Sequence, residues 1–125
     1  MSTLNVSNIT DGTTTVGTSY VVNGSAKAWI NFNGTGTIAI LDSNNVSSLA
    51  DNGVGRYGSN FSSSLTSANY AVSGSVPYAT WGAAVHADFY GSSDTSSQMG
   101  STVIVPYSAY YDGSDIYTTA HGDLA

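Results

Sequence analysis

The sequence predicts an all-β fold, a small antiparallel β-sandwich or barrel-like domain that spans residues 1–125. Residues that favour helices are scarce, since the 125-residue chain contains only two Lys and Arg together and no Glu. β-Branched and aromatic residues, with nine Tyr among them, alternate with small polar residues as they do in half-buried strands. Fourteen Gly residues separate these runs at positions that suit turns. We find no linker and no internal repeat, so we expect one domain.

The beginning of the chain is expected to form two short strands. Leu4 and Val6 share one parity of a strand over residues 3–9, and the Asp-Gly pair at 11–12 then turns the chain. Tyr-Val-Val at residues 20–22 predicts a second strand, because all three residue types favour extended backbone.

A hairpin is predicted at residues 26–41, which read AKAWINFNGTGTIAIL. Its central Asn-Gly-Thr-Gly suits a turn, and the flanking runs carry apolar side chains on both of their faces. A strand with two apolar faces is usually buried on both sides, and in so small a protein one side can be a neighbouring subunit. We therefore assign the large apolar residues of this hairpin, and the second Trp of the chain, to the core or a subunit interface. These residues are Trp29, Ile30, Phe32, Ile38, Ile40 and Trp81.

A second hairpin is predicted from residues 46–49 and 56–61. The Asn-Gly pair at 52–53 lies between these two strands and supplies the positive φ angles of a type I′ turn. A further short strand is expected at residues 70–72.

The second half of the chain is expected to contain one long strand and one more hairpin. Residues 79–90 alternate between apolar and small or polar side chains, and residues 91–101 read as a polar loop. The last hairpin would pair residues 102–111 with residues 116–120 across a turn at 112–115.

The charge of the chain excludes several classes of partner. Its net charge is -6, with only two basic residues, which is too few to bind a phosphate backbone or an anionic membrane surface. We therefore expect no nucleic-acid partner. No apolar run approaches the ~20 residues of a membrane-spanning helix, so we expect no membrane insertion. Charged residues make up only 8% of the chain, so its surface must be rich in Ser, Thr, Asn and Gly. Such a surface suits assembly, or binding to neutral, hydroxyl-rich partners.

Two motifs carry a resemblance to a known family. Residues 26–37 contain KAWINFNGTGT, and residues 45–57 read NVSSLADNGVGRY. With Phe61 and the ANYA of residues 68–71, this pattern extends over residues 20–75. It resembles a recurrent module of tailed-phage virion proteins, in particular the distal regions of tail fibres and tail spikes.

The resemblance implies β-rich structure, homotrimeric assembly and a place on the virion, often at a host-recognition tip. Residues 76–125 lie outside it, and we expect them to form C-terminal β-hairpins and loops. The module usually ends a long fibre, whereas here it follows residues 1–19. We therefore expect attachment to another virion protein.

The aromatic residues near the C-terminus are the predicted receptor-binding site. Tyr rings stack on the apolar faces of sugars, and neighbouring Asp side chains accept hydrogen bonds from hydroxyls, although the same residue types also suit strand packing and protein interfaces. The predicted site comprises Tyr107, Tyr110, Tyr111, Asp112, Asp115 and Tyr117.

Metal and catalytic sites find little support. The pairs His86 with Asp88 and His121 with Asp123 are spaced to share a strand face, and each pair suits either a polar contact or part of a metal site. Two ligands are fewer than a structural metal site needs, so we predict no metal and no cofactor. Cysteine is absent, and no Gly-x-Ser-x-Gly motif marks a nucleophile. We predict that the protein is not an enzyme.

Two functions remain open from the sequence. The first is a bacteriophage tail-fibre or fibre-tip module, located on the virion, that binds a host surface glycan or protein. The alternative is a capsid decoration or cement protein, or a tail connector, without receptor binding. Both imply a homotrimer in contact with other virion proteins.

Overall fold

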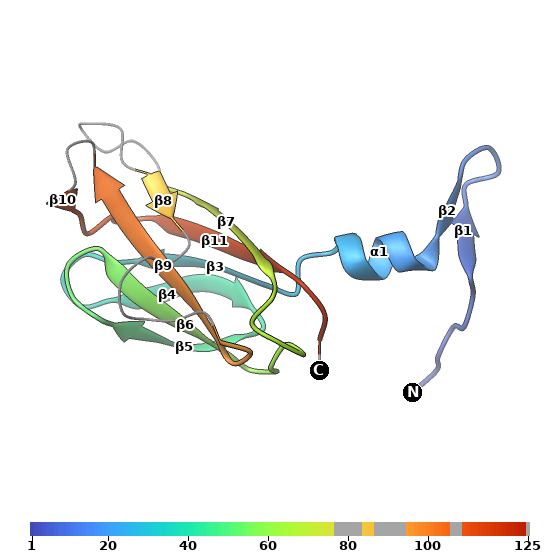
Figure 1. Ribbon diagram of the computed structural model, residues 1–125, viewed down its shortest axis with the longest axis horizontal. Coiled ribbons are helices and arrows are strands. Elements are labelled where there is room, and N and C mark those ends of the chain that lie inside the picture. The colour runs from blue at the N-terminus through green and yellow to red at the C-terminus, as the bar shows by residue number, and fades with distance from the viewer. Residues whose placement is uncertain (77–83, 87–94, 106–108, 125) are drawn as a thin grey trace.

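The computed structural model describes residues 1–76, 84–86, 95–105 and 109–124, and nearly all of its regular secondary structure consists of antiparallel strands (Figure 1). The predicted all-β class is therefore confirmed. The elements in chain order are β1 (Asn8–Thr10), β2 (Thr15–Gly17), α1 (Thr18–Gly24), β3 (Ala28–Asn33), β4 (Ala39–Asn44), β5 (Val46–Asp51), β6 (Arg56–Phe61), β7 (Ala71–Ser75), β8 (Ala84–His86), β9 (Gln98–Val105), β10 (Ala109–Tyr110) and β11 (Ile116–His121).

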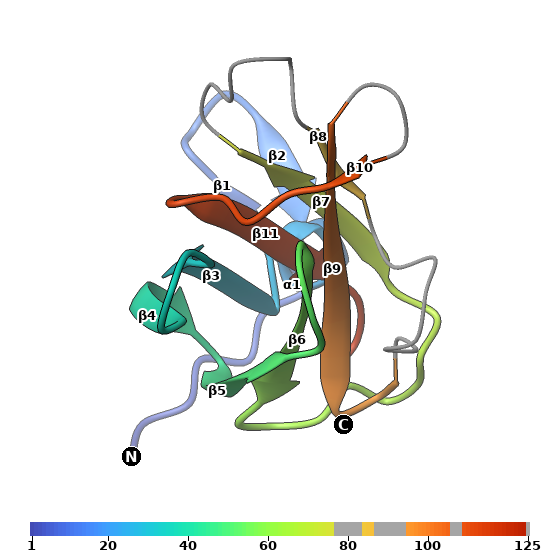
Figure 2. The ribbon, with the colours of Figure 1, turned by 90° about the vertical axis from the view of Figure 1, so that its left-hand side faces the viewer.

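Two sheets pack face to face and enclose one core (Figure 2). One sheet has the order β4-β3-β11-β7, and the other has the order β10-β9-β6-β5 with β8 also paired to β9. Each sheet contributes its inward side chains to a single cluster of buried residues. This cluster comprises Ala28, Ile30, Phe32, Ile116 and Ala120 from the first sheet, and Tyr57, Phe61, Met99 and Val103 from the second, with Leu65 from the connection after β6.

The predicted hairpin at residues 26–41 is present as β3 and β4, which pair antiparallel. Its first strand alternates strictly, because Ala28, Ile30 and Phe32 are buried while Trp29 points to the opposite face. The Phe32 ring meets the Tyr57 ring of the other sheet edge-on, with 5.0 Å between the ring centroids. Such edge-to-face contacts add to the stabilisation that burial alone provides.

The residues assigned to core or interface divide accordingly. Ile30 and Phe32 belong to the core, and Ile38 is partly buried and packs against it. Trp29 and Ile40 are exposed in this chain. Trp81 lies outside the described residues.

The second predicted hairpin is also present, as β5 and β6, but the predicted turn type is wrong. Positive φ angles occur at Gly53 and Gly55, not at Asn52, so the connection is a four-residue loop in place of a type I′ turn. Gly55 has φ +64°, and a Cβ atom there would lie 2.6 Å from the backbone nitrogen of Tyr111. A side chain at this position would be both strained and obstructed.

The predicted strand at residues 20–22 is wrong, because these residues lie in the short helix α1. β-Propensity reflects packing on a pleated surface, and no residue of α1 is buried. The helix instead closes its last turn through the Ser25 amide, which donates to the Val21 carbonyl. The strand expected at residues 3–9 is reduced to β1, which pairs with β2 around the predicted turn at 11–12.

The predicted C-terminal hairpin is wrong as well. β9 pairs with β6, β8 and β10, whereas β11 lies in the other sheet between β3 and β7. Part of the polar loop expected at 91–101 is strand, because β9 begins at Gln98 and directs Met99 into the core. Of the long strand expected at 79–90, the described part is β8.

A hydrogen bond between buried Tyr57 and half-buried Asp112 fixes the segment before β11. The Tyr57 hydroxyl lies 2.7 Å from Asp112 Oδ1 and 3.0 Å from the Gly34 carbonyl oxygen. The Gly55 amide donates to the same Asp112 oxygen over 2.7 Å. Asp112 therefore ties the loop before β11 to the β5–β6 loop, and its Oδ1 accepts two bonds from within the protein.

This pair predicts a specific dependence of stability on alkaline pH. Burial raises the pKa of Tyr57 well above its ordinary value, and the hydrogen bond to Asp112 and the charge of that carboxylate raise it further. Above pH ~10 the unfolded chain releases this proton while the folded chain keeps it, so the stabilisation is complete below pH ~10 and decreases as the pH rises. Tyr57 alone should lower the free energy of unfolding by up to about 1.4 kcal/mol per pH unit there.

Urea denaturation between pH 9 and 11.5 measures this effect. Tyr57→Phe should flatten the alkaline slope, whereas Tyr20→Phe, at an exposed position, should leave it unchanged. Identical slopes in wild type and Tyr57→Phe would show that the buried phenol does not carry the effect.

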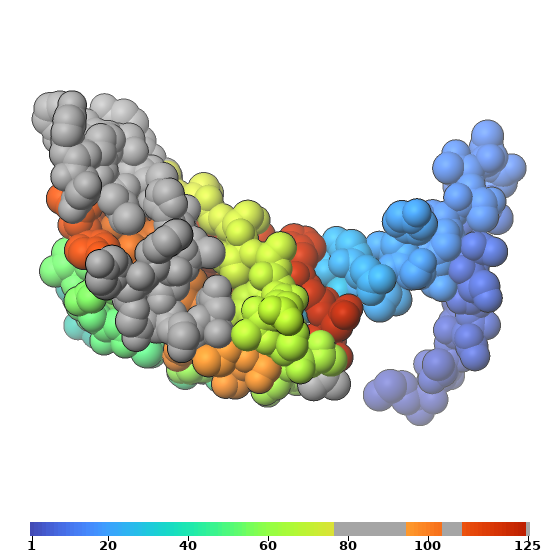
Figure 3. Space-filling view, viewed as in Figure 1, coloured from blue at the N-terminus to red at the C-terminus, as the bar shows by residue number. Residues whose placement is uncertain are grey.

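Residues 1–25 form an arm that projects from the sandwich (Figures 1 and 3). The arm exposes several apolar side chains, including Leu4 with 83% of its surface accessible. It meets the body through α1, where Lys27 Nζ donates to the carbonyl oxygens of Val22 and Ser25. At seven residues, α1 is the one helix of the described part and is too short to cross a bilayer.

Candidate functional site

The outer face of the β4-β3-β11-β7 sheet carries two rows of polar and aromatic side chains. Residues paired across antiparallel strands share a face, so the register alone defines these rows. The first row runs Ser75, Tyr117, Asn31, Asp42 across the four strands. The second row runs Ser73, Thr119, Trp29, Asn44.

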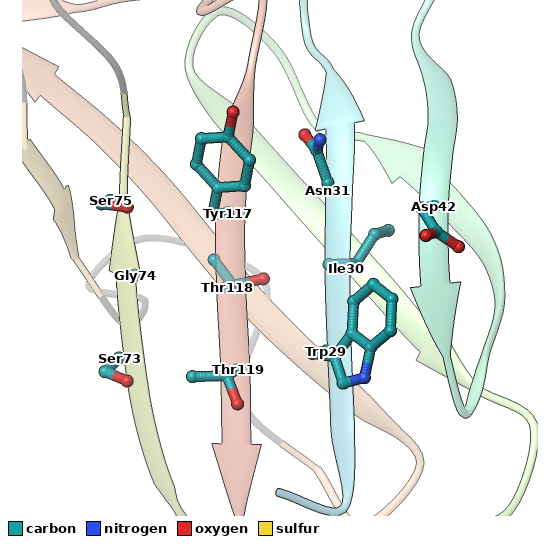
Figure 4. Close-up of a pocket in the computed structure, with 10 residues that line it drawn as sticks. All are labelled: Trp29, Ile30, Asn31, Asp42, Ser73, Gly74, Ser75, Tyr117, Thr118 and Thr119. Carbon is teal, nitrogen blue, oxygen red and sulfur yellow. The ribbon is translucent and has the colours of Figure 1, made fainter.

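All members of these rows except Asn44 line a groove with a volume of about 580 Å³ (Figure 4). That volume falls within the range of small-molecule sites, roughly 300–1,000 Å³. Trp29 is 37% exposed and Tyr117 is 40% exposed, although the inward residues beside them in β3 and β11 are fully buried. The two rings come from adjacent strands and stand diagonally to each other, with a Cα separation on the order of 7–8 Å.

The shape of the groove follows from the sizes of the side chains. Strand β7 presents Ser73, Gly74 and Ser75, which are small and leave space above the sheet. Figure 4 shows Tyr117 standing on β11 and the Trp29 indole lying between β3 and β4. The groove therefore has large aromatic rings on the central strands and hydroxyl groups toward the β7 edge.

Two acceptors complete the polar lining. Asp42 on β4 is exposed, and its Oδ1 accepts from the Ser43 amide over 2.8 Å. Asn31 lies between Tyr117 and Asp42, and its enclosed Oδ1 has no hydrogen-bond partner among the residues that the structure describes. Among the described residues that line the groove there is no Lys or Arg.

The structure distributes the predicted receptor-binding residues over both sheets. Tyr117 lies in the groove, whereas Tyr110 belongs to β10 at the edge of the other sheet. The Arg56 guanidinium stands 5.4 Å from the centroid of the Tyr110 ring. Tyr111 is exposed beside β10, while Asp112 is half-buried and bonded to Tyr57.

The remaining members of that prediction are Asp115 and Tyr107. Asp115 is half-buried and accepts from the Ser114 hydroxyl over 3.2 Å. Tyr107 lies outside the described residues.

Sequence reasoning assigned Trp29 to the core or an interface and did not select it as a ligand residue. The signal for the groove was present, because Trp29 shares its parity with polar Asn31 and opposes Ala28, Ile30 and Phe32. A single Trp on the polar parity of a strand indicates an outward-facing ring. Asn31, Asp42, Ser73, Ser75 and Thr119 could not be found in this way, since only the pairing of distant strands brings them together.

The His-x-Asp pairs form no cluster in the described structure. His121 ends β11 and is partly exposed, and Asp123 follows it on the surface. His86 lies in β8, and its partner Asp88 is outside the described residues. Within the ranges that the structure describes, no group of three or more His, Cys, Asp or Glu could hold a metal ion.

Comparison with protein families, with curated proteins and with solved structures finds no match to this chain. The site is therefore defined by its geometry alone. That geometry offers aromatic faces, hydroxyls and a carboxylate in one groove, a combination suited to binding a polyhydroxylated molecule.

Proposed function

We propose that the protein is a phage virion protein, a tail-fibre or fibre-tip module, that binds a host surface glycan in the groove of the β4-β3-β11-β7 sheet. The observation that carries the proposal is the exposure of Trp29 and Tyr117 on adjacent strands of a hydroxyl-lined groove. The place on the virion rests on the resemblance of residues 20–75 to tail-fibre and tail-spike modules.

Binding would use the two kinds of surface that a sugar presents. The apolar face of a pyranose ring would stack on Trp29 or Tyr117, where the aromatic rings offer large rigid surfaces. The equatorial hydroxyls would donate to Asp42 and exchange hydrogen bonds with the hydroxyls of the β7 edge. No reacting group is required, which agrees with our proposal of a binding protein and not an enzyme.

A homotrimer would strengthen a weak single site. Once one groove of the trimer has bound a glycan, the other two grooves are held close to further glycans on the same host surface. The overall avidity would therefore exceed the affinity of each copy. The arm of residues 1–25 supports attachment to other virion proteins, because its exposed apolar side chains are suited to an interface.

The same arm favours the second candidate function, a capsid decoration or cement protein or a tail connector. A protein with that role would use the arm for assembly and would need no ligand in the groove. The two candidates therefore differ in the position of the protein and in the use of the groove.

Position on the particle separates the two. An antibody-gold label on the protein in assembled particles should appear at the tail-fibre tips, and sedimentation of the purified protein should give a homotrimer. Label over the capsid shell would contradict the fibre-tip proposal and support the cement role. A monomer in sedimentation would contradict the multivalent mechanism.

A further inference from the structure

We infer that the groove selects uncharged sugars and amino sugars over acidic ones, and that Asp42 is the residue that sets this selectivity. This inference rests on the proposed function, because it names the chemical class of glycan for the same groove. It starts from the placement of the charged groups in the described structure.

Asp42 is the one acidic group among the described residues that line the groove, and none of those lining residues is a Lys, Arg or His that could offset its charge. The two basic residues of the chain are both engaged elsewhere. Lys27 is 8% exposed and donates to the carbonyl oxygens of Val22, in α1, and of Ser25, just after it. Arg56 lies in the opposite sheet beside Tyr110. An acidic sugar would therefore enter a groove that contains the negative charge of Asp42, with no positively charged side chain among the described lining residues.

Asp42 is close enough to the aromatic rings to affect any bound sugar. It pairs with Asn31 across β3 and β4, and Trp29 lies two residues before Asn31 on the same face. Figure 4 shows the Trp29 indole on the side of β3 that faces β4, the strand that carries Asp42. A pyranose stacked on Trp29 would thus present its hydroxyls to the Asp42 carboxylate.

A carboxylate at this position favours particular partners. It can only accept hydrogen bonds, so sugar hydroxyls and ammonium groups are its natural donors. Hydrogen bonds to an ionised acceptor are stronger than those between neutral groups, and an amino sugar would gain an ion pair as well. A sugar carboxylate or phosphate would instead be repelled, by an amount that depends on its distance and on the ionic strength.

A glycan array of matched oligosaccharides tests this selectivity. Each neutral oligosaccharide is printed beside its uronic-acid counterpart and its amino-sugar counterpart, and binding of the complete protein is measured at low and physiological salt. Wild type should bind neutral or amino members about 10-fold more tightly than the acidic members. The preference should weaken as the salt concentration rises.

The variant Asp42→Asn removes the charge and keeps the side-chain size and the Oδ1 acceptor. It should reduce the preference to about 2-fold or less. Neutral sugars should also bind more weakly, because their hydrogen bond to Asp42 loses its ionised acceptor. Asp123→Asn is the matched control, since it changes the net charge equally at an exposed position outside the groove. It should leave the preference intact.

The possible failures are distinct. The inference would be overturned if binding depends on Trp29 but acidic sugars bind as tightly as neutral ones or more tightly. It would also be overturned if Asp42→Asn does not change the preference. Either result would leave the proposed glycan site standing. Absence of any Trp29-dependent binding across the array would overturn the proposed function, and the inference with it.

Discussion

Replacing Trp29 with alanine should reduce receptor binding by at least about 30-fold, because a central aromatic residue in a binding site commonly contributes about 2 kcal/mol or more. Trp29 supplies an exposed ring to the groove and lies beside Tyr117 on the neighbouring strand. Its loss should leave the fold intact, since its side chain points away from the core. Adsorption of the purified protein to host cells, with circular dichroism as the check on folding, measures both parts of this expectation.

Tyr110→Ala is the matched control for this experiment. Tyr110 is an aromatic residue with similar exposure, at 39%, but it lies on β10 at the edge of the other sheet. Binding should therefore survive this substitution. If Tyr110→Ala abolished binding and Trp29→Ala did not, the receptor site would lie at the β10 edge and the groove would have another role.

Replacing Phe32 with alanine should lower the free energy of unfolding by about 3–5 kcal/mol, as is usual for a fully buried aromatic residue. Phe32 has no accessible surface and contacts the Tyr57 ring of the opposite sheet. The two sheets would lose a contact that joins them, and a cavity would remain. Domains of this size have a total stability of about 5–15 kcal/mol, so a large share would be removed.

Urea denaturation of Phe32→Ala and Trp29→Ala measures how much stability is lost when a side chain is removed from the inward or the outward face of β3. The destabilisation should be clearly larger for Phe32, because Trp29 keeps part of its surface in solvent in the native state. A loss below about 1 kcal/mol for Phe32, or a larger loss for Trp29, would mean that the faces of β3 are assigned the wrong way round.

The hairpins β3–β4 and β5–β6 could be predicted from sequence because their signals are local. In β3 the strict alternation of Ala28, Ile30 and Phe32 with Trp29 indicates both the strand and its inward face. In β5 and β6 the apolar pattern and the Gly residues between them indicate the hairpin, although not the loop geometry.

The arrangement of the C-terminal half could not be predicted in this way. Strand β11 pairs with β3, more than 80 residues earlier, and with β7, and no local pattern specifies such partners. The predicted loop at residues 91–101 includes the start of β9, because small residues such as Gly100 and Ser101 conceal the alternation of this strand. Their burial depends on the sheet opposite, which the local sequence does not reveal.

The candidate site shows the same limit. Tyr117 was selected from its residue type, and the structure places it in the groove. Trp29 was assigned to the core or an interface because apolar residues surround it in the sequence. Asp42 became important only through its register with Asn31. The order of the strands decides which residues lie side by side on the face of a sheet, so the groove could not be predicted before that order was known.

The most direct test of the proposal that the groove binds a glycan is an NMR titration of the labelled protein with the neutral oligosaccharide that binds most tightly on the array. The Trp29 indole N–H and the backbone amides of β3, β7 and β11 should shift together, in proportion to occupancy. Amides at β10 and in the β5–β6 loop should stay unchanged. Shifts confined to β10 and its neighbours, with the Trp29 indole unaffected at saturation, would contradict the groove as the receptor site.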